Sequence, residues 1–222
     1  MAKRYLPFLL IAAVLMSGLG WGSLLYRRHL EQNPPVPRFL AAGKPGAIPP
    51  HVQGSTGAPV SLEEFGDYEC LPCAGAFAVL QKIEAEYRGR VSLTFRQYPL
   101  KMHLHAMDAA RAAEAAGRQE RFWQMHEALY SNRAVWTIAG ADVPALFNGY
   151  ASAAGLDLTR FKNDLNDPAT AKRIADDQER ATSVGVDRTP SVFINGTPLP
   201  FTLLKVETLR TEIDRALHEK AK

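Results

Sequence analysis

Residues 60–73 read VSLEEFGDYECLPC, a short apolar segment that runs directly into a pair of cysteines. The apolar residues of Val60–Phe65 predict a buried β-strand, and Cys70–Tyr87 predicts a helix because its apolar side chains recur along one face. Val91–Phe95 alternates between apolar and polar residues, which predicts a second strand that ends at Tyr98-Pro99. A strand, a helix and a parallel strand in this order form a βαβ unit, so an α/β fold is expected.

The chain changes character after this unit. Residues 103–184 contain Ala-rich and amphipathic stretches that favour helices, so we expect a helical block inserted into the α/β unit. Ser191–Ile194 predicts a short strand, and Asn195-Gly196 predicts a tight turn into a partner strand at Pro198–Phe201. A C-terminal helix is predicted by apolar residues at helical spacing, namely Val206, Leu209, Ile213 and Leu217. The expected order is therefore βαβ, helical block, ββα.

The N-terminal 30 residues differ from the remainder in hydropathy. Tyr5–Tyr26 contains no charged residue, and as a helix rising about 1.5 Å per residue it would cross the ~30 Å hydrocarbon core of a bilayer. We expect residues 1–30 to form a transmembrane anchor. The alternatives are a cleaved signal segment, with Gly18-Leu19-Gly20 as the cleavage site, and a buried core helix.

Localisation and domain limits follow from this segment. Both an anchor and a signal segment would carry the body across the membrane, so we expect a single-pass protein of the cell membrane with its catalytic domain on the periplasmic side. The alternative is secretion to the periplasm after cleavage. Residues 31–54 are rich in Pro and Gly and predict an extended linker, although His51–Gly54 could pair as an edge strand. The globular domain is expected at residues 55–222.

The charge distribution argues against one class of partner. The formal net charge of the whole chain is +3 at pH 7, but residues 1–30 hold four of the basic residues and no acidic one. The remainder has 22 basic residues against 23 acidic ones, so the body is nearly neutral. A neutral body without a basic stripe does not favour nucleic acid as a partner.

Cys70 and Cys73 are the only two cysteines in the chain, at the predicted junction of strand and helix. This spacing brings both thiols to one helical turn, and a helix N-terminus favours the thiolate. Cys70 is therefore predicted to be an exposed nucleophile and Cys73 the resolving thiol. A zinc site would need two more ligands, of which His103 and His105 are the nearest candidates, and a structural disulfide across so short a loop would stabilise little. We expect neither a metal nor a cofactor.

Two motifs resemble those of the DsbA-like thiol-disulfide oxidoreductases, which have a thioredoxin-like fold. Residues 60–73 resemble the active-site strand and helix start of that family, and RTPSVFING at residues 188–196 resembles its second motif. Tyr98–Ala116 resembles the start of the inserted helical domain. The resemblance extends over residues 55–220 and implies a thioredoxin-like fold interrupted by a helical insertion.

The resemblance also implies roles for residues of this chain. It implies a cis peptide bond before Pro190, which would present the backbone of Thr189 to a bound substrate. It places Glu64 at the position of a buried acid that relays the proton of Cys73. Glu63 is the alternative residue for this position, and Glu64 could instead be a surface carboxylate at a strand end.

Residues around the cysteine pair permit weaker expectations. The negative charges of Asp67 and Glu69 would raise the pKa of Cys70, but we expect both side chains to be solvated and without effect on the thiol. His103 and His105 are expected to be solvated as well, with a position facing the active site as the alternative. Leu71 lies between the cysteines and cannot donate a hydrogen bond to a thiolate.

These observations predict a membrane-tethered, extracytoplasmic thiol-disulfide oxidoreductase. It would exchange disulfides with thiol- or disulfide-containing proteins through Cys70 and Cys73, acting as an oxidase, and a membrane redox partner would reset the pair. One alternative is a reductase or isomerase on the same fold. Another is a redox-inert tethered module that binds peptides, although such a module has no need of a dithiol.

Overall fold

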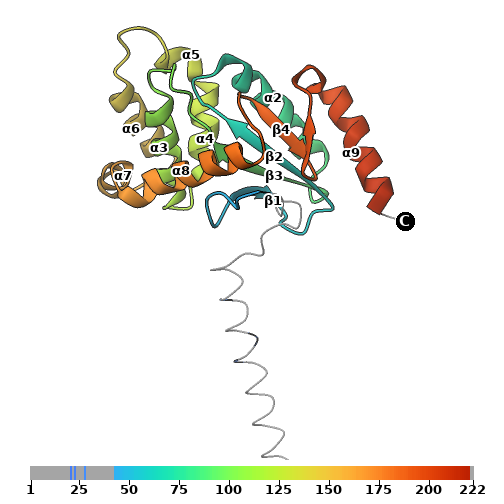
Figure 1. Ribbon diagram of the computed structural model, residues 1–222. Helices are drawn as coiled ribbons and strands as arrows, with labels where there is room; N and C mark the ends of the chain where they lie inside the picture. Colours follow the sequence, from blue (N-terminus) through green and yellow to red (C-terminus); the bar gives the residue numbers. More distant parts are fainter. Residues whose placement is uncertain (1–20, 22, 24–27, 29–42, 221–222) are drawn as a thin grey trace, which may run out of the picture. The chain divides into compact units, whose positions relative to one another are not determined.

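The computed structural model describes residues 43–220 and, before them, only Trp21, Ser23 and Arg28 (Figure 1). Nearly all of the anchor expected at residues 1–30, and the first half of the linker expected at 31–54, lie outside the described residues. Within the part of the chain that is described, no helix has both the length and the apolar character needed to span a membrane.

A five-stranded sheet runs through the centre of the domain. Its strands, in the order β1-β3-β2-β4-β5, are β1 (His51–Gly54), β3 (Val91–Gln97), β2 (Val60–Gly66), β4 (Ser191–Ile194) and β5 (Thr197–Leu199). The β2–β3 pair is parallel, and the other three pairs are antiparallel. The predicted βαβ unit and C-terminal hairpin are thus confirmed, and the turn between β4 and β5 has positive φ at Asn195 (48°) and Gly196 (81°).

Helices cover both faces of the sheet. On one face lie α2 (Leu71–Glu86) and α9 (Val206–Lys220), which Figure 1 shows beside each other. On the other face α8 (Pro168–Ser183) contacts β3. The rest of the helical block, which falls within the predicted residues 103–184, consists of α3 (Ala106–Gly117), α4 (Phe122–Ser131), α5 (Arg133–Trp136), α6 (Val143–Ala153) and α7 (Leu158–Leu165).

Strand β2 is buried along its whole length. Because side chains alternate along a strand, Val60, Leu62 and Glu64 share one face. Val60 and Leu62 pack with residues of α2 and α9 on that face. Phe65 packs with Ala181 on the opposite face, next to α8. The neighbouring Glu63 and Glu64 therefore point into two different layers of the domain.

The sheet begins earlier than the sequence suggested. Strand β1 pairs with β3, with His51 opposite Phe95, so the edge strand considered for His51–Gly54 is present. The preceding residues are also attached to the body, since Arg96 donates to the carbonyl oxygens of Pro45 at 3.1 Å and Ala47 at 3.0 Å. The second part of the expected linker thus belongs to the folded domain, which extends N-terminal to the boundary expected at residue 55.

A buried ionic network holds three elements together. Glu63 of β2 accepts hydrogen bonds from Arg96 of β3 at 2.9 Å and from Arg180 of α8 at 2.6 and 2.7 Å. Arg96 also donates to Asp177 of α8 at 3.0 Å. These four side chains are at most 4% exposed. Charges buried to this degree are tolerated only when they are paired, so the network fixes α8 against the sheet.

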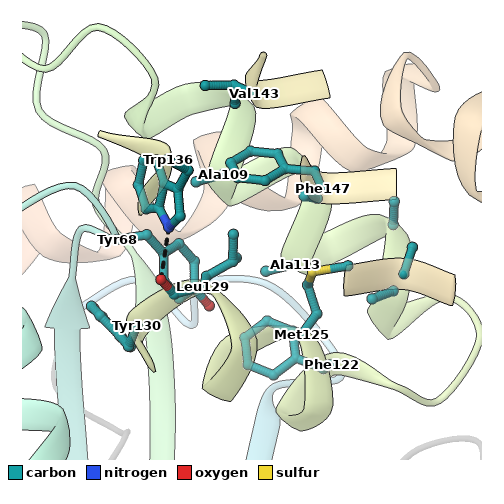
Figure 2. Close-up of a cluster of buried hydrophobic side chains, with 14 of the residues drawn as sticks. Tyr68, Ala109, Ala113, Phe122, Met125, Leu129, Tyr130, Trp136, Val143 and Phe147 are labelled. Carbon is teal, nitrogen blue, oxygen red and sulfur yellow. Dashed lines mark hydrogen bonds between the residues drawn. The ribbon is translucent and has the colours of Figure 1, made fainter. Parts of the chain in front are cut away.

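The apolar core of the helical block is continuous with the α/β unit, since it includes Tyr68, Cys73 and Phe95 (Figure 2). The alanines of α3 let neighbouring helices approach closely, and Phe122 and Met125 of α4 are buried against them. Trp136 is fully buried, and its Nε1 donates to the carbonyl oxygen of Leu129 at 2.8 Å, as Figure 2 shows. The block therefore buries many of its apolar side chains against the sheet and its own helices, whereas Met107, Val135 and Ile138 stay exposed.

The Glu63 network yields a prediction about stability. Glu63→Gln should lower the free energy of unfolding by about 3–5 kcal/mol, because it removes a buried anion that both Arg96 and Arg180 contact. Urea unfolding followed by circular dichroism measures the loss. Glu179→Gln is the matched control, since it removes an exposed pair with Lys44 and should cost less than ~1 kcal/mol. Equal losses in the two variants would contradict the assignment.

Candidate active site

Cys70 lies at the first turn of α2. It is the N-cap residue, with extended backbone angles (φ −70°, ψ 122°), and its side chain makes no capping hydrogen bond. Pro72 occupies the first turn, where a missing N–H costs nothing. The sulfur thus sits at the positive end of the helix, beside backbone N–H groups that lack intrahelical partners.

The second motif meets the first because β4 pairs directly with β2. Ser191 lies opposite Phe65 in this pairing, so the segment before β4 lies near the segment after β2. Cys70 Sγ lies 3.6 Å from the carbonyl oxygen of Thr189, to which the thiol donates. The Thr189–Pro190 peptide bond is cis, the isomer that the resemblance implies. Residues 119 positions apart in the chain are thereby brought into contact.

The surroundings shift the pKa values of the two thiols in opposite directions. A hydrogen bond from Cys73 lowers the pKa of Cys70 to about 6, whereas burial and the charge of Asp67 oppose this shift. Burial, the hydrogen bond to Cys70 and the charge of Glu64 raise the pKa of Cys73. At neutral pH the pair therefore holds a thiolate at Cys70 and a thiol at Cys73. Cys70 is less open than expected, with 5% of its surface exposed against 0% for Cys73.

Glu64 is fully buried on the face of β2 that α2 covers. None of the described residues forms a hydrogen bond with either of its carboxyl oxygens. Burial, followed by the charge of Cys70, raises the pKa of Glu64 to about 8, so the group is largely protonated at neutral pH. Glu63, the alternative residue, is also buried but is engaged by two arginines on the opposite face. Of the two, only Glu64 has a carboxyl group that is free to exchange a proton.

A cavity of about 200 Å³ reaches Glu64 between α2 and α4. Its lining includes Phe77 of α2 and both Trp123 and His126 of α4. Burial, with a smaller effect of His51, lowers the pKa of His126 to about 3, so this imidazole is neutral. A cavity of this size with polar groups in its wall can hold water. The proton of Glu64 can therefore exchange with water without passing the thiols.

Asp67 was expected to be solvated, and this expectation is wrong. The residue is 2% exposed, and its carboxylate accepts hydrogen bonds from the backbone N–H of Glu69 and of Leu100, both at 2.8 Å. The same carboxylate lies 2.8 Å from Nδ1 of His103. Glu69 in turn accepts a hydrogen bond from the backbone N–H of His105 at 2.6 Å. These carboxylates fasten the start of α2 to the loop at residues 100–105.

One signal in the sequence could have located Asp67. It directly follows β2, at the edge of the sheet where the C-terminal ends of the parallel strands β2 and β3 meet. Side chains at that edge converge, as they do at the ligand sites of other open α/β sheets. His103 gave no comparable signal, because its contact depends on the path of a loop.

Curated relatives match most of this chain but only part of their own length. The Na(+)/H(+) antiporter NhaA 1 of Mycolicibacterium gilvum is 34% identical over 193 residues, which are 84% of this chain and 30% of that protein. The protein of the same name from Salinispora arenicola is 39% identical over 147 residues, which are 66% of this chain and 22% of that protein. The chain thus spans less than a third of the length of these relatives.

A family model described as Thioredoxin matches residues 47–215. A thioredoxin-like oxidoreductase from Silicibacter pomeroyi is similar at 27% identity with a TM-score of 0.64, over 76% of this chain and 92% of that one. BdbD from Bacillus subtilis shares the fold at 23% identity with a TM-score of 0.69, over 80% of this chain and 97% of that one. The protein α-DsbA1 from Wolbachia pipientis also shares the fold, at 20% identity with a TM-score of 0.65, over 78% of this chain and 92% of that one. The chain therefore belongs to the thioredoxin family and has the architecture of its DsbA-like thiol-disulfide oxidoreductases.

Proposed function

We propose that this protein is a thiol-disulfide oxidoreductase that oxidises the thiols of extracytoplasmic proteins. The observation that carries the proposal is the asymmetry of the cysteine pair, in which a stabilised Cys70 thiolate at a helix N-terminus is backed by a protonated Cys73. The backbone of Thr189 lies beside the sulfur and can align a substrate chain next to it.

The reaction proceeds by two exchanges of sulfur partners. A substrate thiolate attacks Sγ of Cys70 in the disulfide form, the Cys70–Cys73 bond breaks, and a mixed disulfide forms. Cys73 leaves as a thiolate and takes a proton, which Glu64 can supply. A second substrate thiolate then attacks the substrate sulfur of the mixed disulfide and releases Cys70 as a thiolate. The substrate loses two electrons and the pair gains them, after which a disulfide-bearing membrane partner reoxidises the dithiol.

The acidity of Cys70 supports the oxidising direction. A dithiol form that is stabilised by its thiolate makes the corresponding disulfide a stronger oxidant. Leu71 and Pro72 contribute no side-chain donor, so the stabilisation comes from Cys73 and from the helix terminus. A reductase or isomerase would use the same residues with a less acidic Cys70.

The exchange activity tests the proposal directly. The full-length chain in its disulfide form should oxidise a reduced, unfolded substrate protein stoichiometrically. Cys70→Ser should abolish the reaction because it removes the attacked sulfur. Cys73→Ser, mixed in its thiol form with a disulfide-bearing protein, should accumulate mixed disulfides, because Cys70 attacks that disulfide, a substrate thiolate leaves, and no Cys73 thiol resolves the product. Thiol counting and non-reducing gels measure both results.

Equilibration of the wild-type pair in glutathione buffers then establishes the direction. An oxidase takes the dithiol form in mildly oxidising buffer. A pair that remains a disulfide in strongly reducing buffer would identify a reductase, and a chain without any exchange would identify a binding module.

Glu64 should make stability depend on pH. Its pKa is raised in the folded state, so the folded state holds an additional proton between about pH 4.5 and 8 and loses stability as the pH rises through that window. Glu64→Gln should therefore raise the free energy of unfolding at pH 7 by about 3 kcal/mol, with no gain below pH 4.5. The same variant should slow the formation of the mixed disulfide, because the departing Cys73 loses its proton donor.

Urea unfolding of the dithiol form between pH 4 and 8 measures the effect on stability, and stopped-flow mixing of the disulfide form with a reduced peptide measures the rate. Glu127→Gln is the control, since Glu127 is an exposed carboxylate that lines the same cavity. A pH-independent difference between wild type and Glu64→Gln would contradict the raised pKa.

We also propose that residues 5–26 anchor the protein in the membrane, with the domain on the periplasmic side. The support is the uncharged run itself, flanked by Lys3 and Arg4 before it and by Arg27 and Arg28 after it. Membranes washed in carbonate should retain the full-length chain at its unprocessed mass. Recovery of a soluble chain that begins near Trp21 or Ser23 would show that the segment is a cleaved signal.

A further inference from the structure

The contact between Asp67 and His103 is placed where it can act on Cys70. Asp67 lies three residues before Cys70, and its carbonyl oxygen accepts a hydrogen bond from the Cys70 backbone N–H at 3.2 Å. Its carboxylate is fully buried, whereas the His103 side chain 2.8 Å away is 23% exposed. One partner therefore brings a charge into the site, and the other exchanges protons with solvent.

The buried carboxylate has two backbone donors and one side chain that can carry positive charge. The donors are the N–H groups of Glu69 and Leu100, which hold the carboxylate in place whatever the state of the imidazole. Among the described residues, His103 is the only side chain that forms an ion pair with Asp67. The net charge of the pair is therefore −1 when His103 is neutral and zero when it is protonated.

We propose that the Asp67–His103 pair is an electrostatic control of the Cys70 thiolate, in which protonation of His103 cancels the repulsion that Asp67 exerts on the sulfur. The proposal rests on the proposed function, because it concerns the nucleophile of that reaction. His103 is a positioning residue here, since it acts on the sulfur through Asp67. Its effect is independent of the Leu71-Pro72 dipeptide between the cysteines, which offers no side-chain donor.

Other charged and titratable groups surround this site. These groups belong to the segments around Cys70 and the Asp67–His103 pair, and they are Glu64, Glu69, Cys73, Lys101, His105, Asp108, Tyr130, Arg133 and Arg188. Lys101, Arg133 and Arg188 are cationic side chains, and Glu69 and Asp108 are carboxylates. Nδ1 of His105 lies 3.7 Å from the Asp108 carboxylate, and His105 forms no ion pair with Asp67. Burial raises the pKa of Glu64 to about 8, so this group is largely protonated at neutral pH.

The coupling has a reciprocal consequence. If protonated His103 favours the thiolate, the thiolate must favour protonated His103 by the same factor. Oxidation of the pair to a disulfide removes the negative charge from Cys70. His103 should then release its proton more readily, so its titration should report the redox state of the cysteines.

Alkylation of Cys70 tests the proposal with the full-length chain. The rate of reaction of the reduced protein with iodoacetamide, followed between pH 4.5 and 8 with the site identified by mass spectrometry, reports the thiolate fraction. His103→Gln should lower the rate near pH 5 by about three-fold. It removes a positive charge from a partly exposed position near the sulfur, and one such charge changes the ionisation equilibrium of a thiol by a few-fold. His103→Lys, which keeps a positive charge, should restore the rate.

His105→Gln is the matched control and should follow the wild-type profile. The second readout is the NMR titration of the His103 ring, whose pKa should be higher in the dithiol form than in the disulfide form. A merely structural role would not make this titration depend on redox state. The proposal is overturned if His103→Gln and wild type coincide at every pH, if His105→Gln has the same effect as His103→Gln, or if the His103 titration is identical in both redox forms.

Neither measurement requires exchange with a protein substrate. A chain that proves inactive as an oxidase could still show the coupling, and an active oxidase could lack it. The two proposals can therefore fail separately.

Discussion

The alternation of side chains along β2 is the constraint on which the rest of the structure depends. It turns two adjacent carboxyl groups into opposite layers of the domain. Glu63 enters the layer beneath α8, where Arg96 and Arg180 neutralise it and secure the helical block to the sheet. Glu64 enters the layer beneath α2, where none of the described residues pairs with it and burial leaves it protonated. A shift of one residue in register would turn every side chain of β2 to the opposite layer, so Glu63 and Glu64 could not both keep these environments.

The site also depends on where β4 joins the sheet. Pairing of β4 with β2 brings the Thr189 segment to the start of α2, although the helical block separates the two motifs in the chain. The block can be accommodated because its buried residues, Trp136 and Phe122 among them, join one apolar cluster with Tyr68 and Phe95 of the α/β unit. It also contributes to the site, since α4 forms a wall of the cavity that reaches Glu64. The insertion is thus packed into the same core as the α/β unit and lines the cavity beside Glu64.

Local signals explain how much of this could be predicted from the sequence. The βαβ unit, the hairpin at Asn195-Gly196 and the helix that begins at the cysteines each depend on neighbouring residues, and all are present. The environment of Asp67 was misjudged because its partners Leu100 and His103 lie 33 and 36 residues away and are reached only through the fold. The attachment of residues 43–50 to the body was missed for the same reason. Nothing local to the Pro-rich residues 43–50 reveals that arginines of β3 and α8 bind their carbonyl groups.

Those carbonyl groups have a mechanical consequence. Arg180 donates to the carbonyl oxygen of Lys44 at 2.7 Å, and Arg96 donates to those of Pro45 and Ala47. Tension applied to the chain ahead of Gly43 therefore reaches two guanidinium groups before it reaches the edge strand β1. Because both groups are anchored on Glu63 at the centre of the sheet, the force is shared among β2, β3 and α8 instead of peeling β1 from β3 one hydrogen bond at a time. A domain held by its N-terminal segment can thus withstand pulling without losing the register of the strand that carries its active site.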